Sequence, residues 1–360
     1  MIDRHFWKDK RVLITGHTGF KGSWLALWLK KMGSQVSGYS LDPPFHPNLF
    51  TLAGLESRID SHIADIGDGN RLQDVFRRFE PQIVFHLAAQ SLVRRSYVDP
   101  IETYRTNVLG TLNVLEAVRH SSTVVAVVNV TTDKCYENSE WYWGYRETDP
   151  LGGHDLYSSS KAASEILTQS YRRSFFPTED YGRSHQVLLA TARAGNVIGG
   201  GDWSQDRLVP DCIRAVDQGR ELAIRSPGAI RPWQHVLEPL SGYLALGQRL
   251  FERDQTVADA WNFGPADDEA RTVSWVVERV KSSFPSLVVN YDRSPQPHEA
   301  KFLRLDCSKA RQELKWSPVW DTLSAVDKTC QWYQAHQAGI DMHGFTLKQV
   351  EEYEHGQERS

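Results

Sequence analysis

The stretch Arg11-Val12-Leu13-Ile14-Thr15-Gly16-His17-Thr18-Gly19-Phe20-Lys21-Gly22 decides the fold of this chain. It begins with an apolar run that predicts a strand, and it leads into an apolar segment, Trp24 to Leu29, that predicts a helix ending at Gly33. The glycines between them are spaced three apart. Such a turn lets backbone N–H groups and the helix dipole hold a pyrophosphate. A plain strand-to-helix turn is the alternative, but the spacing and context favour the pyrophosphate site.

Further strands and helices alternate through the first half of the chain. Strands are predicted over residues 35–39, 83–87, 124–130 and 186–192, and the two middle runs are continuously apolar, as in strands buried on both faces. Helical spacing is found over residues 101–118 and 157–175. This alternation predicts an α/β fold, a Rossmann-type doubly wound parallel sheet.

After about residue 195 the pattern changes to shorter elements and Gly- and Pro-rich loops, which predicts a smaller C-terminal α/β substrate domain. We assign residues 1–193 to a dinucleotide-binding domain that the chain rejoins at about 233–262. Residues 194–232 and 263–345 form the expected second domain. The polar end, residues 346–360, is expected to fray.

Composition excludes several classes of function. The chain has 360 residues, 41 Lys+Arg against 45 Asp+Glu, and a formal net charge of −4. It has no apolar stretch long enough for a membrane span and no basic stripe for nucleic acid, and its first ten residues are not expected to act as a secretory leader. Its four cysteines are too scattered for a disulfide framework or a zinc site. We therefore expect a cytoplasmic protein without a metal, a nucleic-acid partner or a membrane partner.

Acidic and small residues after the next strands fit a dinucleotide. Asp42 lies at the distance where an acid holds the adenosine ribose, although it could equally be a turn residue before Pro43. The absence of arginine between Tyr39 and Pro47 favours NAD over NADP. Contacts to the cofactor, or mere packing, are expected of residues that follow the third and fourth strands: Asp65, Ile66, Leu87, Ala88 and Ala89.

Two groups of residues carry acid–base chemistry. Tyr157 and Lys161 are four residues apart and share a helix face, so the ammonium can help the phenol act as a base. Thr132 and Asp133 follow a buried strand, at the carboxyl edge where open α/β sheets bind ligands. The alternative is a turn that only ends the strand.

The chain resembles the extended short-chain dehydrogenase/reductase family and, within it, the nucleotide-sugar 4,6-dehydratases. Four separated motifs carry the resemblance: Gly16 to Trp24, Thr132-Asp133-Lys134-Cys135-Tyr136, Gly195 to Trp203, and Arg231-Pro232-Trp233-Gln234-His235-Val236.

The resemblance implies NAD as the cofactor and assigns site residues. Those implied to hold the cofactor are Gly16, Thr18, Gly19, Phe20, Lys21, Gly22, Asp42, Asp65, Ile66, Leu87, Ala88, Ala89, Asn107, Tyr157 and Lys161. Those implied to hold the substrate are Arg193, Asn196, Arg231 and His235, and the catalytic set is Thr132, Asp133, Lys134, Tyr157 and Lys161.

The implied reaction oxidises C4 of the sugar, eliminates water across C5 and C6, and returns the hydride to C6. Lys134 stands where the dTDP-glucose branch has a glutamate as the C5 base, so it is either a neutral base or a cation that stabilises the enolate. The motifs are most similar to the branch that uses CDP-glucose in deoxysugar synthesis for lipopolysaccharide O-antigen. A 4-epimerase or reductase, or dehydration of another nucleotide sugar, is the alternative. The resemblance also implies a homodimer or higher homo-oligomer.

Overall fold

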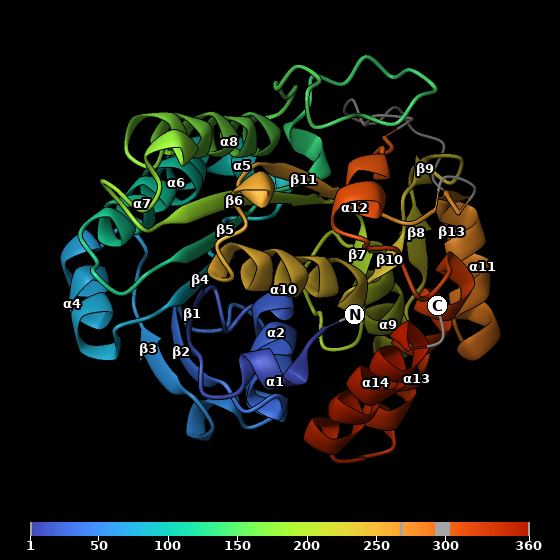
Figure 1. The fold of residues 1–360 in the computed structure, drawn as a ribbon. Helices are drawn as coiled ribbons and strands as arrows, with labels where there is room; N and C mark the ends of the chain where they lie inside the picture. The colour runs from blue at the N-terminus through green and yellow to red at the C-terminus, as the bar shows by residue number, and fades with distance from the viewer. Residues whose placement is uncertain (1, 267–268, 292–302, 359–360) are drawn as a thin grey trace.

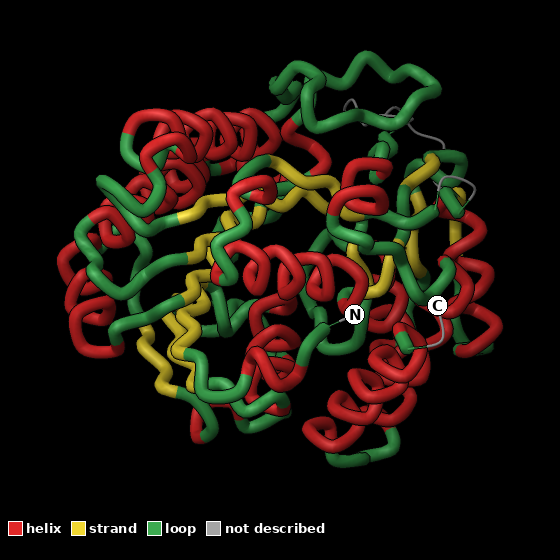
Figure 2. Tube along the Cα trace, viewed as in Figure 1, coloured by secondary structure: helices red, strands yellow, loops and turns green. Residues whose placement is uncertain are grey.

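The fold is built on one seven-stranded sheet. The structure, a computed structural model, describes residues 2–266, 269–291 and 303–358. Every neighbouring pair in the sheet is parallel, in the order β11-β6-β5-β4-β1-β2-β3 (Figures 1 and 2). The strands are β1 (Arg11–Thr15), β2 (Gln35–Ser40), β3 (Asp60–Ile63), β4 (Ile83–His86), β5 (Ala126–Val130), β6 (Leu188–Ala194) and β11 (Ala260–Phe263).

Helices cover both faces of this sheet, as the sequence predicts for a doubly wound fold (Figure 1). Val12 and Ile14 belong to one apolar core and Leu13 to the other, because successive side chains of a strand point to opposite faces. One face carries α2 (Phe20–Lys31) and α10 (Leu237–Phe251). The other carries α4 (Gly69–Phe79), α7 (Gly110–Arg119) and α8 (Leu156–Ser174).

The helix predicted over residues 101–118 is interrupted. It consists of α6 (Pro100–Tyr104), a π-helical turn (Arg105–Leu109) and α7, and a separate α5 (Val93–Val98) precedes it. Asp99, between α5 and α6, caps the second segment by accepting a hydrogen bond from the Glu102 N–H at 2.8 Å. The apolar spacing is correct for a helix, but it does not reveal this change of helical pitch.

The remaining elements lie mostly beyond β6. Three two-stranded sheets pair β7 with β10, β8 with β13, and β9 with β12. Their strands are β7 (Val197–Ile198), β8 (Leu222–Ile224), β9 (Ile230–Arg231), β10 (Gln234–His235), β12 (Arg271–Thr272) and β13 (Val289–Tyr291). The other helices are α1 (Arg4–Trp7), α3 (Leu49–Leu52), α9 (Leu208–Gln218), α11 (Val273–Ser283), α12 (Ser308–Glu313), α13 (Thr322–Gln337) and α14 (Met342–Gln357).

The expectation that the polar end frays is wrong for its described part. Residues 342–357 form α14, which packs against α2 and α13. Met342, Thr346, Val350 and Tyr353 recur at helical spacing and are buried, so the polar composition conceals one apolar stripe. The strand β11 does rejoin the main sheet beside β6. Which segments bind which ligand stays a prediction.

No helix in the described ranges is both long enough and apolar enough to span a bilayer.

Candidate active site

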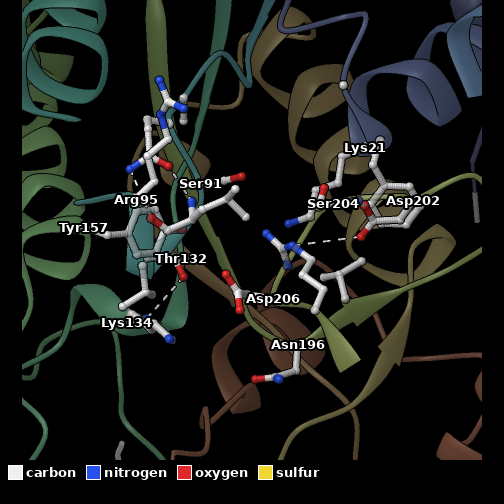
Figure 3. Close-up of a pocket in the computed structure, with 18 of the residues that line it drawn as sticks. Lys21, Ser91, Arg95, Thr132, Lys134, Tyr157, Asn196, Asp202, Ser204 and Asp206 are labelled. Carbon is white, nitrogen blue, oxygen red and sulfur yellow. Dashed lines mark hydrogen bonds and ion pairs between the residues drawn. The ribbon is translucent and has the colours of Figure 1, made fainter. Parts of the chain in front are cut away.

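A cavity of about 1210 Å³ opens at the carboxyl ends of the sheet strands, the edge where ligands of doubly wound folds bind. Figure 3 shows Tyr157, Thr132 and Lys134 along one wall and Lys21 with Asp202 along the opposite wall. The cavity brings together most of the predicted site residues. Those that line it are Gly16, Thr18, Gly19, Phe20, Lys21, Gly22, Asp42, Asp65, Ile66, Leu87, Ala88, Ala89, Thr132, Asp133, Lys134, Tyr157, Lys161, Asn196 and Arg231.

The glycine-rich turn forms a close-packed cradle. Gly16 has φ +79°, and a Cβ on it would lie 2.8 Å from the Ala88 nitrogen. A Cβ on Gly22 would lie 2.1 Å from the Gly16 carbonyl oxygen. Helix α2 starts after Gly19 with no side chain capping it, so its first N–H groups remain available to an anion. These features fit a dinucleotide pyrophosphate.

The rim beyond the turn is held by short hydrogen bonds. The Thr18 hydroxyl donates to the Leu41 carbonyl oxygen at 2.8 Å, which fixes the loop that bears the exposed Asp42. Asp65 accepts a hydrogen bond from the Gly67 N–H at 2.8 Å. Both carboxylates line the cavity, so both are in position to contact a cofactor.

Helix α8 presents Tyr157 and Lys161 to the cavity. Asp155 caps the helix by accepting a hydrogen bond from the Ser158 N–H at 2.9 Å, which sets where its first turn begins. Burial raises the pKa of Tyr157 to about 12, although the Thr132 hydroxyl and the Arg207 charge lower it. Burial lowers the pKa of Lys161 to about 8, and its ammonium donates to the Val130 carbonyl oxygen at 3.2 Å.

The turn after β5 carries the second reactive group. The Thr132 hydroxyl accepts from the Lys134 N–H at 3.3 Å and donates to Asp133 Oδ1 at 3.0 Å. Asp133 is 2% exposed, and its Oδ2 has no hydrogen-bond partner among the described residues. A Cβ on Gly195 would lie only 1.8 Å from that oxygen, so the glycine leaves room for the carboxyl group.

Three predicted site residues do not line this cavity, and their contacts lie inside the protein. The Arg193 guanidinium forms a buried ion pair with Glu165 at 2.8 Å and donates to the Tyr136 hydroxyl at 2.7 Å. It points to the sheet face that α8 covers. Its partners therefore tie α8 to the segment that follows the Thr132 turn.

His235 and Asn107 are also buried beside the cavity and not on its wall. His235 is fully buried, with its ring 5.7 Å from that of Trp24 and 4.8 Å from that of Trp320. Burial lowers the pKa of His235 to about 3, so the ring is neutral. Asn107 bonds to both backbone groups of Gln90, which lines the cavity, and to the Ser160 hydroxyl at 2.8 Å.

The cavity also contains cations that the sequence did not single out. Arg207 immediately precedes α9, and its charge lowers the pKa of both Tyr157 and Lys21. Arg94 and Arg225 line other parts of the wall. Arg207 and Arg225 lie outside helices and strands, and Arg94 lies in the short helix α5, so no periodicity marks them. Burial also lowers the pKa of Lys21 to about 7.

Comparison with known proteins identifies the family. A family model described as GDP-mannose 4,6 dehydratase matches residues 13–329. The CDP-glucose 4,6-dehydratase of Salmonella typhimurium is 49% identical over 354 residues, which is 98% of each chain. A dTDP-glucose 4,6-dehydratase of Xanthomonas campestris is 28% identical, covering 91% of this chain and 94% of its own.

Solved structures agree on the fold. The dTDP-glucose 4,6-dehydratase of Bacillus anthracis in complex with NAD superposes with a TM-score of 0.75 at 22% identity, over 92% of this chain and 99% of its own. The UDP-glucose 4-epimerase of Thermotoga maritima gives 0.77 at 21% identity, over 91% and 99%. From the family match and the 49% identical relative, the chain belongs to the GDP-mannose 4,6-dehydratase family, within the extended short-chain dehydrogenase/reductases, and it is an enzyme of the hydro-lyase class.

Proposed function

We propose that this enzyme dehydrates CDP-D-glucose to CDP-4-keto-6-deoxy-D-glucose with NAD as its resident cofactor. The observation that carries the proposal is that Tyr157, Thr132 and Asp133 meet in the cavity that the glycine-rich turn opens into. The Salmonella relative, named a CDP-glucose 4,6-dehydratase and 49% identical, supports the substrate.

The cradle around Gly16 and Gly22 supports NAD binding, since its backbone approaches closely and the N-terminus of α2 is uncapped. Asp42 on the rim suits the ribose hydroxyls, and no cavity arginine follows β2 directly to hold a 2′-phosphate. Bound NAD would supply the hydride acceptor and donor. The enzyme's side chains then handle the protons.

Tyr157 accepts the proton of the sugar 4-hydroxyl in this proposal, and Thr132 hydrogen-bonds the same hydroxyl. Lys161 supplies positive charge near the reacting centre while it carries its proton. Its hydrogen bond to the Val130 carbonyl oxygen fixes the ammonium between the strand end and the cavity.

Asp133 acts as the general acid for the departing C6 hydroxyl. Its Oδ1 accepts from the Thr132 hydroxyl, and its Oδ2 is buried beside Gly195 without a hydrogen-bond partner among the described residues. Lys134, next along the turn, lines the same cavity and is a candidate for handling the C5 proton. It acts there either as a neutral base or as a cation that stabilises the enolate.

Arginines suit the substrate diphosphate because their donors are planar and paired. Arg231 lines the cavity and is 6% exposed. Arg207, directly before α9, lines the same cavity. Asn196 has φ +42°, and its backbone carbonyl oxygen accepts from the Gln234 N–H at 3.3 Å. This bond fixes the backbone of Asn196 at the cavity wall. We assign these three residues to the nucleotide sugar.

A 4-keto-6-deoxy product fits a role for the enzyme in making deoxysugars for surface polysaccharide such as O-antigen. Its use of NAD and a nucleotide sugar supports a cytoplasmic reaction.

The test is to incubate the enzyme with NAD⁺ and, separately, CDP-glucose, dTDP-glucose, UDP-glucose or GDP-mannose, and to measure the alkali-induced absorbance of a 4-keto-6-deoxy product. We expect turnover of CDP-glucose. Turnover of another nucleotide sugar alone would keep the reaction and overturn the substrate. Interconversion of UDP-glucose and UDP-galactose without any keto product would instead identify a 4-epimerase.

A further inference from the structure

Asp133 is the general acid of the proposed function, on which this inference rests, and its carboxyl group is held from two sides. Its Oδ1 accepts a hydrogen bond from the Thr132 hydroxyl at 3.0 Å. Its Oδ2 lies against Gly195, where a Cβ would come within 1.8 Å of that oxygen and 2.2 Å of the carboxyl carbon. Because Asp133 is 2% exposed, the position of the Gly195 backbone determines where the carboxyl group can lie.

Gly195 directly follows strand β6, and Gln234 on β10 holds its backbone. The side-chain NH₂ group of Gln234 donates to the Gly195 carbonyl oxygen at 3.2 Å and to the Phe263 carbonyl oxygen at 2.9 Å. Phe263 is the last residue of β11, the neighbour of β6 in the sheet. The backbone N–H of Gln234 donates to the Asn196 carbonyl oxygen at 3.3 Å. One residue therefore joins the ends of two adjacent strands and binds two consecutive carbonyl groups after β6.

The amide of Gln234 is explained by these two donors and not by filling space. Gln234 is 1% exposed and does not line the cavity, and its Oε1 has no hydrogen-bond partner among the described residues. A buried acceptor without a partner lowers the stability of the fold, whereas leucine or methionine would fill the same volume without that cost. Two carbonyl oxygens on separate strands can be held at once by one NH₂ group, because it has two N–H bonds to donate.

We propose that Gln234 is a positioning residue for the general acid: it fixes the Gly195 backbone and, through it, the Asp133 carboxyl group. Gln234 itself does not reach the cavity. Water loss, which uses Asp133, then depends on Gln234, whereas C4 oxidation, which uses Tyr157, does not. Displacing a catalytic group by about 1 Å can slow its step by about 100-fold, so the loss of a buried support should be visible in the rate of that step.

The experiment follows the near-ultraviolet absorbance of the reduced cofactor after rapid mixing of enzyme, NAD⁺ and CDP-glucose. Its rise reports C4 oxidation, and its decay reports water loss followed by hydride return. Gln234→Met and Gln234→Leu remove both N–H donors at nearly the same side-chain volume. In each variant we expect the rise to stay within about twofold of the wild type and the decay to slow by about 10–100-fold, so that reduced cofactor accumulates.

Two further variants test whether the effect of Gln234 passes through the acid. Gly195→Ala places a methyl group against Asp133 Oδ2 and should slow the decay selectively, as the Gln234 variants do. In an Asp133→Asn background, Gln234→Met should slow the decay further by less than about twofold, because the carboxyl group that it positions is already gone. If Gln234→Met has its full effect in that background, it acts by another route and the positioning role is overturned.

Gln349 on α14 is the matched control for a merely structural role. It is 2% exposed, its side-chain NH₂ group donates to the Lys328 carbonyl oxygen at 2.8 Å, and its Oε1 also has no partner among the described residues. Gln349→Met should lower the melting temperature but leave the ratio of decay rate to rise rate unchanged.

Equal slowing of rise and decay in both Gln234 variants, or selective slowing of the decay in Gln349→Met, would show that Gln234 only supports the fold. An unchanged decay in the Gln234 variants of an active enzyme would overturn the positioning role alone. If the wild type forms no reduced cofactor with any of the four nucleotide sugars, the proposed function fails and the positioning role fails with it.

Discussion

At the scale of single residues, Asp133 is the side chain that distinguishes the proposed dehydration from simple oxidation and reduction. A 4-epimerase needs a tyrosine and a lysine but no acid directed at C6. The buried carboxylate beside Gly195, with one oxygen bonded to Thr132 and the other without a partner in the described structure, is arranged for such an acid.

Replacing this acid should therefore uncouple the two halves of the reaction. Asp133→Asn keeps the shape of the side chain but cannot protonate the C6 hydroxyl. We expect C4 oxidation to persist while water loss slows by about 10²–10⁴-fold. Reduced cofactor then accumulates on the enzyme, seen by its absorbance, whereas Asp74→Asn on exposed α4 should behave as the wild type. Unchanged dehydration would remove Asp133 from this role.

Loss of the Tyr157 hydroxyl should stop the reaction before the cofactor is reduced. In Tyr157→Phe the ring still packs in place, so NAD binding measured by calorimetry should be retained. Turnover should fall by at least about 10²-fold because the proton acceptor is gone. If Tyr157→Phe still turned over and still formed reduced cofactor after rapid mixing with NAD⁺ and CDP-glucose, Tyr157 would not be the proton acceptor.

Lys161 couples function to stability. Its pKa is about 8 in the folded chain against 10.5 in its ordinary state, because burial disfavours the ammonium. Between these values the unfolded chain binds more protons, so this residue makes stability rise with pH from about 8 to 10.5. Below pH 8 the buried charge costs stability. Lys161→Met should thus be inactive yet melt at a higher temperature at pH 7.

The melting temperatures should also be compared at pH about 9.5, which lies between the two pKa values of Lys161. There the folded wild type has lost most of the buried charge, so the gain in melting temperature from Lys161→Met should be smaller than at pH 7. Lys281→Met, at an exposed position of α11, should show no such gain in melting temperature at either pH. An equal gain for both variants would mean that burial of the Lys161 charge is not its cause.

At the scale of elements, the sequence predicts strands better than it predicts which way their side chains point. Continuous apolar runs mark β4 and β5, and the residues after β5 reach the cavity because parallel strands all end at one edge. Arg193 lies on β6, where neighbouring residues face opposite sides of the sheet. Sequence alone could not show that it faces Glu165 on α8 rather than the ligand.

The polar composition of residues 346–360 does not predict α14, because only the spacing of a few buried residues marks the helix. Its buried Glu354 accepts a hydrogen bond from the Trp28 ring N–H at 2.9 Å and pairs with Lys31 at 2.9 Å, both on α2. The contacts of Arg207 and Arg94 with the cavity have no sequence signal for a different reason. Arg207 ends a loop before α9, and Arg94 lies in α5, a helix of six residues that is too short for its apolar spacing to be recognised.

The contact between α14 and α2 should be a measurable part of the stability. Glu354→Ala leaves the Trp28 N–H and Lys31 without their buried acceptor, which should cost about 2–3 kcal/mol in the free energy of unfolding. Glu358→Ala, at an exposed position of the same helix end, should change it by less than about 0.5 kcal/mol. Urea denaturation measures both, and equal small effects would show that α14 docks without this carboxylate.

At the scale of the whole molecule, one group of neighbouring helices exposes several large hydrophobic side chains. The face formed by α5, α6, the π-helical turn and α8 exposes large hydrophobic side chains: Tyr97, Val98, Ile101, Leu109 and Ile166. These helices contact one another at the upper left of Figure 1. Exposed apolar patches of this kind mark interaction surfaces. We propose that two copies of the chain pair through it.

Charges on this face should therefore separate the copies. The double variant Ile101→Glu with Leu109→Glu should sediment as a monomer under conditions where the wild type sediments as a dimer or larger. Ile340→Glu, half exposed between α13 and α14, is the matched control and should leave the assembly intact. A wild-type monomer, or a dimer that survives the double variant, would contradict the proposed interface.

The docking of α14 on α2 also sets an order of events during synthesis. Trp28 and Glu354 are 326 residues apart, and translation at about 5–20 residues per second separates them by roughly 16–65 s. Throughout that interval the helix that opens with the cofactor cradle leaves the ribosome with its tryptophan face uncovered. The last turns of α2, with Trp28 and Lys31, therefore gain their buried carboxylate partner only when nearly the whole chain has been made.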